Sequence, residues 1–186
     1  MSVNRIANRF RGLLISPPLI IALFPFNYET EIDWLIWPLG CFIFLLGMVL
    51  RIWAQQHLHH RLKVKKCLTT TGPYSFIRNP LYVGNMFMCL GATITSELLW
   101  LAPITLFCCF SIYSLVVHYE EEHLAEKYGE PYQRYLSEVP RWLPRAIRFR
   151  NLNLINRYFL ASIVAEIRCP LLLLPYAFKE FILRWI

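Results

Sequence analysis

The chain has 186 residues, of which 56% are hydrophobic and 16% aromatic, and its mean hydropathy is +0.40. These values exceed those of an ordinary soluble domain of this length and indicate a membrane protein. The formal net charge of +7 is compatible with a nucleic-acid partner, but the basic residues lie beside hydrophobic runs. We therefore expect them to contact anionic lipid headgroups, and we predict no nucleic-acid partner.

Four hydrophobic runs predict membrane-spanning helices, in the order 13–26, 34–50, 81–96 and 98–117. The last three contain no charged residue, and the fourth is long enough to cross a bilayer at about 1.5 Å per residue. The first run is short and holds three prolines, so its length also allows a re-entrant or interfacial helix. We expect it to span the membrane with the long side chain of Arg11 reaching the headgroups.

The placement of basic residues predicts the orientation of these helices. Lys and Arg occur before the first run, between the second and third, and after the fourth, whereas the loops 29–33 and 96–97 contain neither. By the positive-inside rule, both termini and the long central loop should lie in the cytoplasm, with four spans.

After the fourth run the chain becomes amphipathic. Residues 120–128 predict a helix that leaves the membrane and ends at Gly129, and Pro131 begins a short helix that ends near Glu138. The segment 157–186 is apolar but interrupted by charged residues and prolines. We expect it to lie in the interface as a helix broken at Pro170. The alternative is a fifth span, which would place the C-terminus outside.

These elements predict an all-α, polytopic membrane helix bundle with about four transmembrane helices and cytoplasmic interfacial helices, in a single membrane domain 1–186. We predict no metal site. The six cysteines lack a zinc-binding spacing, and the cluster of His57, His59 and His60 has no Cys or carboxylate at ligand spacing nearby. An interfacial helix with histidines at the headgroup level is the simpler interpretation of that cluster.

Two polar blocks, 72–82 (GPYSFIRNPLY) and 120–129 (EEEHLAEKYG), each border a hydrophobic run. Each should lie where a membrane helix meets the cytoplasm, and the helical hairpin between them can bring the two together. This arrangement predicts a cofactor pocket at the membrane surface. Simpler interpretations exist for single residues: Pro80 can begin a helix, Arg78 can bind lipid phosphate and Asn85 can join two helices.

The two blocks, followed by Pro140-Arg-Trp-Leu-Pro144, resemble the isoprenylcysteine carboxyl methyltransferase and phospholipid methyltransferase group. These are integral-membrane enzymes that use S-adenosylmethionine. The resemblance covers about residues 40–145, a methyltransferase core, and leaves 157–186 as a C-terminal extension. It implies methyl transfer from S-adenosylmethionine to a lipophilic acceptor: a prenylcysteine-like carboxylate or thiol, a lipid amine, or a small hydrophobic metabolite. The compact length suggests, by family analogy, a prokaryotic inner membrane.

The resemblance also implies site residues. It assigns catalytic roles to Arg78, Asn79 and Glu121, with Glu120 and Glu122 as near rivals of Glu121. The cofactor-binding residues that it implies are His59, Lys66, Cys67, Leu68, Thr69, Tyr74, Asn79, Pro80, Leu81, Tyr82, Glu121 and Glu122.

Two residues depart from the pattern of that group. Asn79 replaces the usual histidine, which removes a titratable ring but keeps hydrogen bonding. Val116 replaces an arginine that is thought to meet the substrate carboxylate in the eukaryotic carboxyl methyltransferases. Two other functions remain open: an NADPH enzyme like the sterol reductases, which share a similar pattern, and a catalytically inactive membrane scaffold. The sequence leaves the oligomeric state open.

Overall fold

The structure, a computed structural model, describes residues 3–24, 32–64, 68–144 and 154–183, without the side chains of 3–5, 33, 59–64, 180 and 182–183. All regular structure within these ranges is helical. The long helices are α1 (Val3–Ile21), α2 (Asp33–Val64), α3 (Pro80–Thr95) and α4 (Leu101–Tyr128). The shorter ones are the 3-10 turn η1 (Gly72–Ser75), α5 (Glu130–Glu138), α6 (Phe159–Glu166), η2 (Cys169–Leu173) and α7 (Leu174–Leu183).

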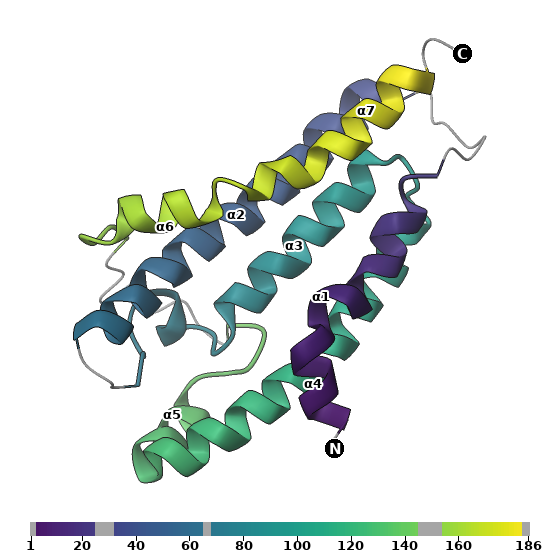
Figure 1. Cartoon of the computed structure of the whole chain (residues 1–186). Coiled ribbons are helices and arrows are strands. Elements are labelled where there is room, and N and C mark those ends of the chain that lie inside the picture. Colours follow the sequence, from purple (N-terminus) through teal and green to yellow (C-terminus); the bar gives the residue numbers. More distant parts are fainter. Residues whose placement is uncertain (1–2, 25–31, 65–67, 145–153, 184–186) are drawn as a thin grey trace.

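The helices are arranged as two pairs with a C-terminal segment along one of them (Figure 1). α2 packs along α3, and α1 packs along α4. The contact between α3 and α4 joins the pairs, and a hydrogen bond of 3.1 Å between the buried hydroxyls of Thr93 and Thr105 crosses it. In the C-terminal segment, α6 packs against α2, η2 contacts α3, and α7 continues along the bundle.

Three segments are long and apolar enough to cross a membrane by length and composition: Trp34–Leu58, Leu101–Tyr128 and Phe159–Lys179. Their surfaces expose large apolar side chains such as Val49 and Phe107, as lipid-facing surfaces do. The all-α membrane bundle predicted from the sequence is therefore confirmed, and its predicted count of about four spans is approximate. α2 continues as one helix past Leu50, where the second span was expected to end, so Arg51 lies inside a candidate span.

Glycines allow the backbones of α2 and α3 to approach each other closely. A Cβ atom at Gly47 would lie 2.5 Å from the carbonyl oxygen of Gly84, and one at Gly91 would lie 2.6 Å from that of Gly40. Within α2 the glycines at 40 and 47 are seven residues apart, and so are those at 84 and 91 within α3. The two contacts therefore form a continuous line between the helices. Such small-residue lines let membrane helices pack through their backbones. Gly84 and Gly91 therefore serve helix packing.

The C-terminal segment contacts the bundle from one end to the other. Near one end Gln56 Nε2 donates to the carbonyl of Leu154 at 2.6 Å. Near the other end, the hydroxyl of Tyr176 donates to the carbonyl of Leu19 at 3.0 Å, and Lys179 Nζ donates to that of Ser96 at 3.2 Å. This course fits the alternative of a fifth span better than a helix lying across one end of the bundle.

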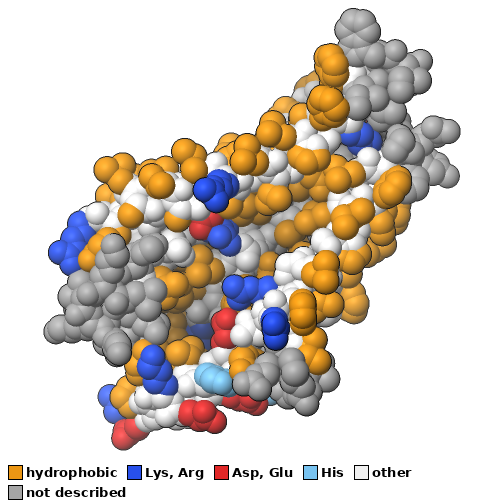
Figure 2. Space-filling model, in the orientation of Figure 1, with side chains coloured by type: hydrophobic (Ala, Val, Ile, Leu, Met, Phe, Trp, Pro, Cys, Tyr) orange, Lys and Arg blue, Asp and Glu red, His pale blue; other side chains and the backbone are white. Residues whose placement is uncertain are grey.

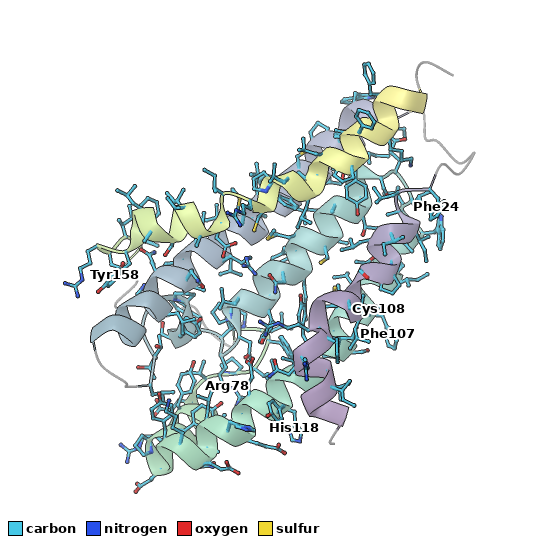
Figure 3. All side chains as sticks on the ribbon, in the orientation of Figure 1. Phe24, Arg78, Phe107, Cys108, His118 and Tyr158 are labelled. Carbon is cyan, nitrogen blue, oxygen red and sulfur yellow. The ribbon has the colours of Figure 1, made fainter. Side chains whose placement is uncertain are left out.

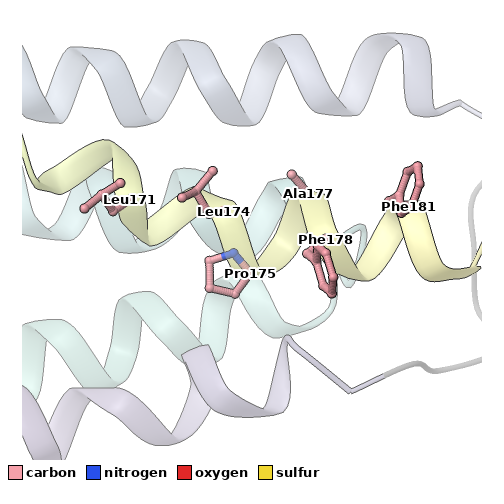
Figure 4. A pocket seen from close by; sticks show the side chains of 6 residues that line it. All are labelled: Leu171, Leu174, Pro175, Ala177, Phe178 and Phe181. Carbon is pink, nitrogen blue, oxygen red and sulfur yellow. The ribbon is translucent and has the colours of Figure 1, made fainter.

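The outer face of that segment is apolar. A shallow depression of about 670 Å³ on α7 and η2 is lined by exposed side chains (Figure 4). They are Leu171, Leu174, Pro175, Ala177, Phe178 and Phe181. Such a surface suits contact with lipid.

Candidate active site

A tight turn before α3 presents the first polar block. Gly72 has a φ of +61°, and the ring of His57 occupies the space where a Cβ would lie. Only glycine meets both conditions without strain. Ser75 Oγ closes the turn by donating to the carbonyl of Gly72 at 2.7 Å. The turn therefore fixes Tyr74 and the chain that follows it against α2.

The same block is held from the other side by α5 and the chain after it. Tyr135, on α5, donates its hydroxyl to the carbonyl of Tyr74 at 2.8 Å. The backbone N–H of Arg78 donates to the carbonyl of Pro140 at 2.9 Å, and the Asn79 side-chain amide donates to that of Arg141 at 3.3 Å. Three hydrogen bonds thus fix the backbone at Tyr74 and Arg78 and the side chain of Asn79, where the chain enters α3.

Glu121, from the second block, lies between two arginines. Its carboxylate is 3.2 Å from Arg78 Nη1 and accepts hydrogen bonds from Arg141 Nε, at 3.2 Å, and Arg141 Nη2. The Glu121 and Arg78 side chains are only 11% and 14% exposed. A carboxylate so little hydrated needs positive partners, and these two supply them. Glu121 therefore links α4 to the start of α3 and to the chain after α5.

Glu120 has different partners. The hydroxyl of Tyr82 donates to Glu120 Oε1 at 2.7 Å and accepts from Arg11 Nη1 at 2.8 Å. Arg11 Nη1 also lies 3.6 Å from Glu120 Oε1. α1 departs from helical geometry at Phe10, directly before Arg11. This chain of contacts joins α1, α3 and α4.

A cavity of about 760 Å³ lies between these elements, and Figure 2 shows basic and acidic side chains gathered in the hollow of the surface. Arg78, labelled in Figure 3, lies where the start of α3 faces α4 and α5. The lining comes from α1, α2, the turn and start of α3, and the end of α4. It consists of Asn8, Arg11, Arg51, Gln55, Leu58, Tyr74, Arg78, Asn79, Pro80, Leu81, Tyr82, Asn85, Tyr119, Glu120, His123, Leu124 and Lys127.

Six of the implied site residues share this lining: Tyr74, Arg78, Asn79, Pro80, Leu81 and Tyr82. Of the three consecutive glutamates, Glu120 is the one on the lining. Glu121 binds the two arginines, and the exposed Glu122 lies 3.3 Å from His118 Nε2.

Other implied residues lie elsewhere. Leu68 packs against the buried Tyr132, Tyr135 and Val139. Thr69 is buried, and its Oγ1 has no hydrogen-bond partner among the described residues. The side chain of His59, and all of Lys66 and Cys67, lie outside the described residues. The roles of all these residues stay predictions.

The cavity also includes residues to which the sequence assigned other roles or none. Arg11 was expected to reach the headgroups, and Asn85 to join helices, while Asn8 received no role. The sequence could have indicated Arg51, because it is a charged residue inside the apolar Trp34–Leu58 segment. Charged residues inside a membrane span are functional candidates by default. The contribution of α1 had no comparable signal, because the resemblance does not extend to it.

The phospholipid methyltransferase family matches residues 36–131, more than half of the chain. The chain belongs to this family. It is 28% identical over 136 residues to the nickel-cobalt-cadmium resistance protein NccN of Alcaligenes xylosoxydans xylosoxydans, covering 72% of this chain and 62% of that protein. It is 30% identical over 121 residues to the cobalt-zinc-cadmium resistance protein CzcN of Cupriavidus metallidurans, covering 65% and 55%.

A third relative is the protein-S-isoprenylcysteine O-methyltransferase of Saccharomyces cerevisiae, 30% identical over 118 residues that cover 57% of this chain and 48% of the yeast protein. The chain therefore spans between about half and three fifths of the length of these relatives. No solved structure matches the chain.

Membership of the phospholipid methyltransferase family confirms the resemblance and makes this chain a member of a family of integral-membrane methyltransferases. The matched residues include both polar blocks, from η1 to the end of α4. α1 and the C-terminal segment lie outside the match, although α1 contributes Asn8 and Arg11 to the cavity.

Proposed function

We propose that this chain transfers a methyl group from S-adenosylmethionine to a lipophilic acceptor at the membrane. The observation that carries the proposal is the shared cavity, in which the run from Arg78 to Tyr82 faces the acidic end of α4. Its volume of about 760 Å³ falls in the range of about 300–1,000 Å³ that is usual for small-molecule sites.

The residues present fit this cofactor. The donor carries a sulfonium, an α-carboxylate, an ammonium and ribose hydroxyls, so its site needs groups of both charges and aromatic faces. Arg78 is on the lining with its Nε lacking a hydrogen-bond partner among the described residues, which suits a carboxylate. Glu120 suits the ammonium or the ribose, and Tyr74 and Tyr82 offer aromatic faces to a cation or to adenine.

When bound, the cofactor supplies an electrophilic methyl group on a positively charged sulfur. The chain itself then contributes mainly position. Well-oriented reactants can gain about 7–11 kcal/mol relative to free collision, and the hydrogen bonds that fix residues 74–79 provide a rigid wall for such orientation. Tyr82 is similarly fixed by Arg11 and Glu120.

The need for a general base depends on the acceptor. A carboxylate acceptor needs none, whereas an amine or thiol must first lose a proton. Glu121 is engaged by two arginines and His118 by Glu122. Glu120 is engaged by Tyr82 and Arg11, whereas His123 lines the cavity and its hydrogen bond to a backbone carbonyl uses Nδ1, so we assign such a step to His123 Nε2.

We further infer that the cavity opens on the cytoplasmic side, with the N-terminus, and that the membrane is a prokaryotic inner membrane. The basic residues before the first hydrophobic run, between the second and third, and after the fourth support this orientation. Figure 1 supports it as well, because the start of α1, the end of α2 and the end of α4 lie toward one side of the bundle.

The test is calorimetric titration of the detergent-purified protein with S-adenosylmethionine, S-adenosylhomocysteine and NADPH. We expect both adenosyl compounds to bind and NADPH not to bind. NADPH binding alone would indicate the reductase-like function, and a protein that binds none of the three would indicate a scaffold. Mass spectrometry of lipids from cells with and without the protein then identifies the acceptor as the species that gains one methyl group.

A further inference from the structure

A buried ion pair inside a candidate membrane span borders the cavity. Neither of its residues belongs to the two polar blocks. Arg51, on α2, donates from Nε to Glu166 Oε2 at 2.9 Å and from Nη2 to Glu166 Oε1 at 2.8 Å. Its Nη1 donates to Asn85 Oδ1, on α3. The Glu166 side chain is 4% exposed and that of Arg51 22%. Arg51 and Asn85 both line the cavity.

Glu166 comes from the C-terminal segment, outside the residues that match the family. Its carboxylate binds the guanidinium in the two-bond geometry that fixes both groups most firmly. The Sγ–H of Cys169 donates a third hydrogen bond to it, at 3.0 Å. The C-terminal segment thus holds a negative charge in a defined position behind Arg51, which lines the cavity.

The Arg51–Glu166 pair has no net charge, but Arg51 keeps hydrogen-bond donors that it does not use among the described residues. A guanidinium carries five N–H groups, and Arg51 uses three of them on Glu166 and Asn85. The remaining two belong to a side chain that lines the cavity. An ionised ligand head beside this neutral pair would leave water without gaining a counter-charge, which is costly in a poorly hydrated site. A hydroxyl or carbonyl oxygen meets the two donors without that cost.

We propose that Glu166 determines acceptor specificity by cancelling the charge of Arg51, so that this wall binds a lipophilic molecule with an uncharged, oxygen-bearing head. The proposal rests on the methyltransferase function proposed above and narrows its acceptor. Without Glu166, Arg51 would present an unpaired cation, and the same wall would favour a carboxylate.

The experiment measures competition against a fluorescent long-chain alcohol on the detergent-purified protein saturated with S-adenosylhomocysteine, so that Arg78, on the same lining, is already occupied. The competitors are a fatty alcohol, a fatty acid and an alkylamine of equal chain length, at a pH where the acid is ionised. Binding in the cavity is the part of the signal that is lost when Leu58→Trp fills it. The wild type should prefer the alcohol. In Glu166→Gln the ratio of fatty-acid to alcohol affinity should rise by about tenfold or more.

Tyr176→Phe is the matched control, because it removes another side-chain anchor of the same segment at a site away from the cavity. It should leave the ratio unchanged. Arg51→Gln should shift preference toward the alkylamine, because it leaves the Glu166 carboxylate unpaired. Arg51→Gln/Glu166→Gln removes both charges and should keep the preference for the alcohol, even if neither single variant folds.

A wild type that prefers the acid or amine, or that shows no cavity-specific binding, would overturn the proposal. So would a Glu166→Gln variant whose ratio equals that of Tyr176→Phe. Titration of the same preparations with S-adenosylmethionine, before S-adenosylhomocysteine is added, separates the two proposals. A wild type that does not bind the cofactor refutes the methyltransferase function. An unchanged ratio of fatty-acid to alcohol affinity in Glu166→Gln refutes only the role of Glu166.

Discussion

The consecutive glutamates 120–122 at the end of α4 face three different environments. Neighbouring residues of an α-helix point about 100° apart, so adjacent carboxylates cannot share a wall. Glu120 meets the cavity and Tyr82, Glu121 meets Arg78 and Arg141, and the third meets solvent. One sequence block therefore combines a ligand-facing group with a structural ion pair.

Glu120→Gln should weaken binding of S-adenosylmethionine while leaving the fold intact. A hydrogen bond to a charged group contributes about 1.5–3 kcal/mol, which corresponds to roughly ten- to hundredfold in affinity. Calorimetric titration measures the change. Glu126→Gln is the control, because Glu126 is exposed on the same helix, and it should bind as the wild type does. Equal affinity of both variants would contradict the role of Glu120.

Glu121→Gln should instead destabilise the protein. The change leaves Arg78 and Arg141 without their shared carboxylate, at a cost of about 2–4 kcal/mol, reduced from fully buried values because Arg141 is 36% exposed. Thermal unfolding in detergent tests this. If Glu121→Gln melts with the wild type yet loses cofactor affinity, the carboxylate has the cofactor-binding role that the family resemblance implies.

The sequence predicts these residues only as a block. It identifies the acidic run and the Arg-Asn-Pro-Leu-Tyr run, because their residue types and spacing follow the family. It does not predict which glutamate meets the cavity, because that depends on the rotation of α4 against α1 and α3. Arg11 shows the same limit, since its contact with Tyr82 arises from the packing of a helix outside the resemblance.

At the scale of elements, glycine contacts set the spacing between α2 and α3, and hence bring Arg51 within hydrogen-bond reach of Asn85 on the cavity wall. Gly84 lies on this line one residue before Asn85, and its missing Cβ leaves space that the Arg51 side chain occupies. The seven-residue spacing of the glycines can be counted in the sequence. The contact of Gly47 with Gly84 cannot be predicted from it, because that contact depends on the register of the two helices.

Gly84→Ala should therefore destabilise the bundle. Its Cβ would lie 2.8 Å from the carbonyl oxygen of Gly47 and 2.6 Å from Arg51 Cγ, and forcing atoms into a packed interface costs about 1–3 kcal/mol. Gly12→Ala is the matched control, because nothing lies within 4 Å of a Cβ there and alanine favours a helix by about 1 kcal/mol. The two apparent melting temperatures should move in opposite directions, and a shared direction would contradict the packing role.

The docking of α5 depends on two buried tyrosines. Burial, with the nearby Glu121 carboxylate, raises the pKa of Tyr132 to about 12. Burial likewise raises the pKa of Tyr135, whose hydroxyl binds the carbonyl of Tyr74. Both folded-state pKa values lie above the ordinary value of about 10. The stability that the neutral phenols contribute is thus fully present below about pH 10 and is lost as the pH rises toward the folded-state value.

Alkaline titration should accordingly show tyrosines that ionise late, followed by loss of the folded state. Tyrosinate absorbance and circular dichroism, followed together, measure the two events. Tyr132→Phe/Tyr135→Phe should lose the part of the late-ionising signal that these two residues contribute. It should already be less stable at neutral pH, because the carbonyl of Tyr74 loses a hydrogen-bond donor worth about 1 kcal/mol. An unchanged absorbance curve in the double variant would show that these tyrosines do not ionise late.

At the scale of the molecule, the cavity is built by four helices that the family resemblance covers only in part. The hydrophobic runs predicted the helices of the core, because apolar length is a local property. The C-terminal segment was expected in the interface because its charges and prolines interrupt the apolar pattern. In the structure Glu166 is paired with Arg51 and Lys179 binds the carbonyl of Ser96. Those long-range partners are what the sequence alone could not supply.

We expect this segment to be a fifth span that carries its end to the face opposite the N-terminus. The paired Glu166 removes the main cost of a charge at membrane depth, and Phe159–Lys179 is long and apolar enough to cross. Reporters fused after residue 183, one fluorescent only in the cytoplasm and one enzymatically active only outside it, decide the location in bacterial cells. The external reporter should be active after residue 183, and the cytoplasmic reporter should be fluorescent when the fusion follows residue 144. If both fusions report the cytoplasm, the segment lies in the interface, and the contact of Lys179 with Ser96 at the far end of the bundle could not form in the membrane.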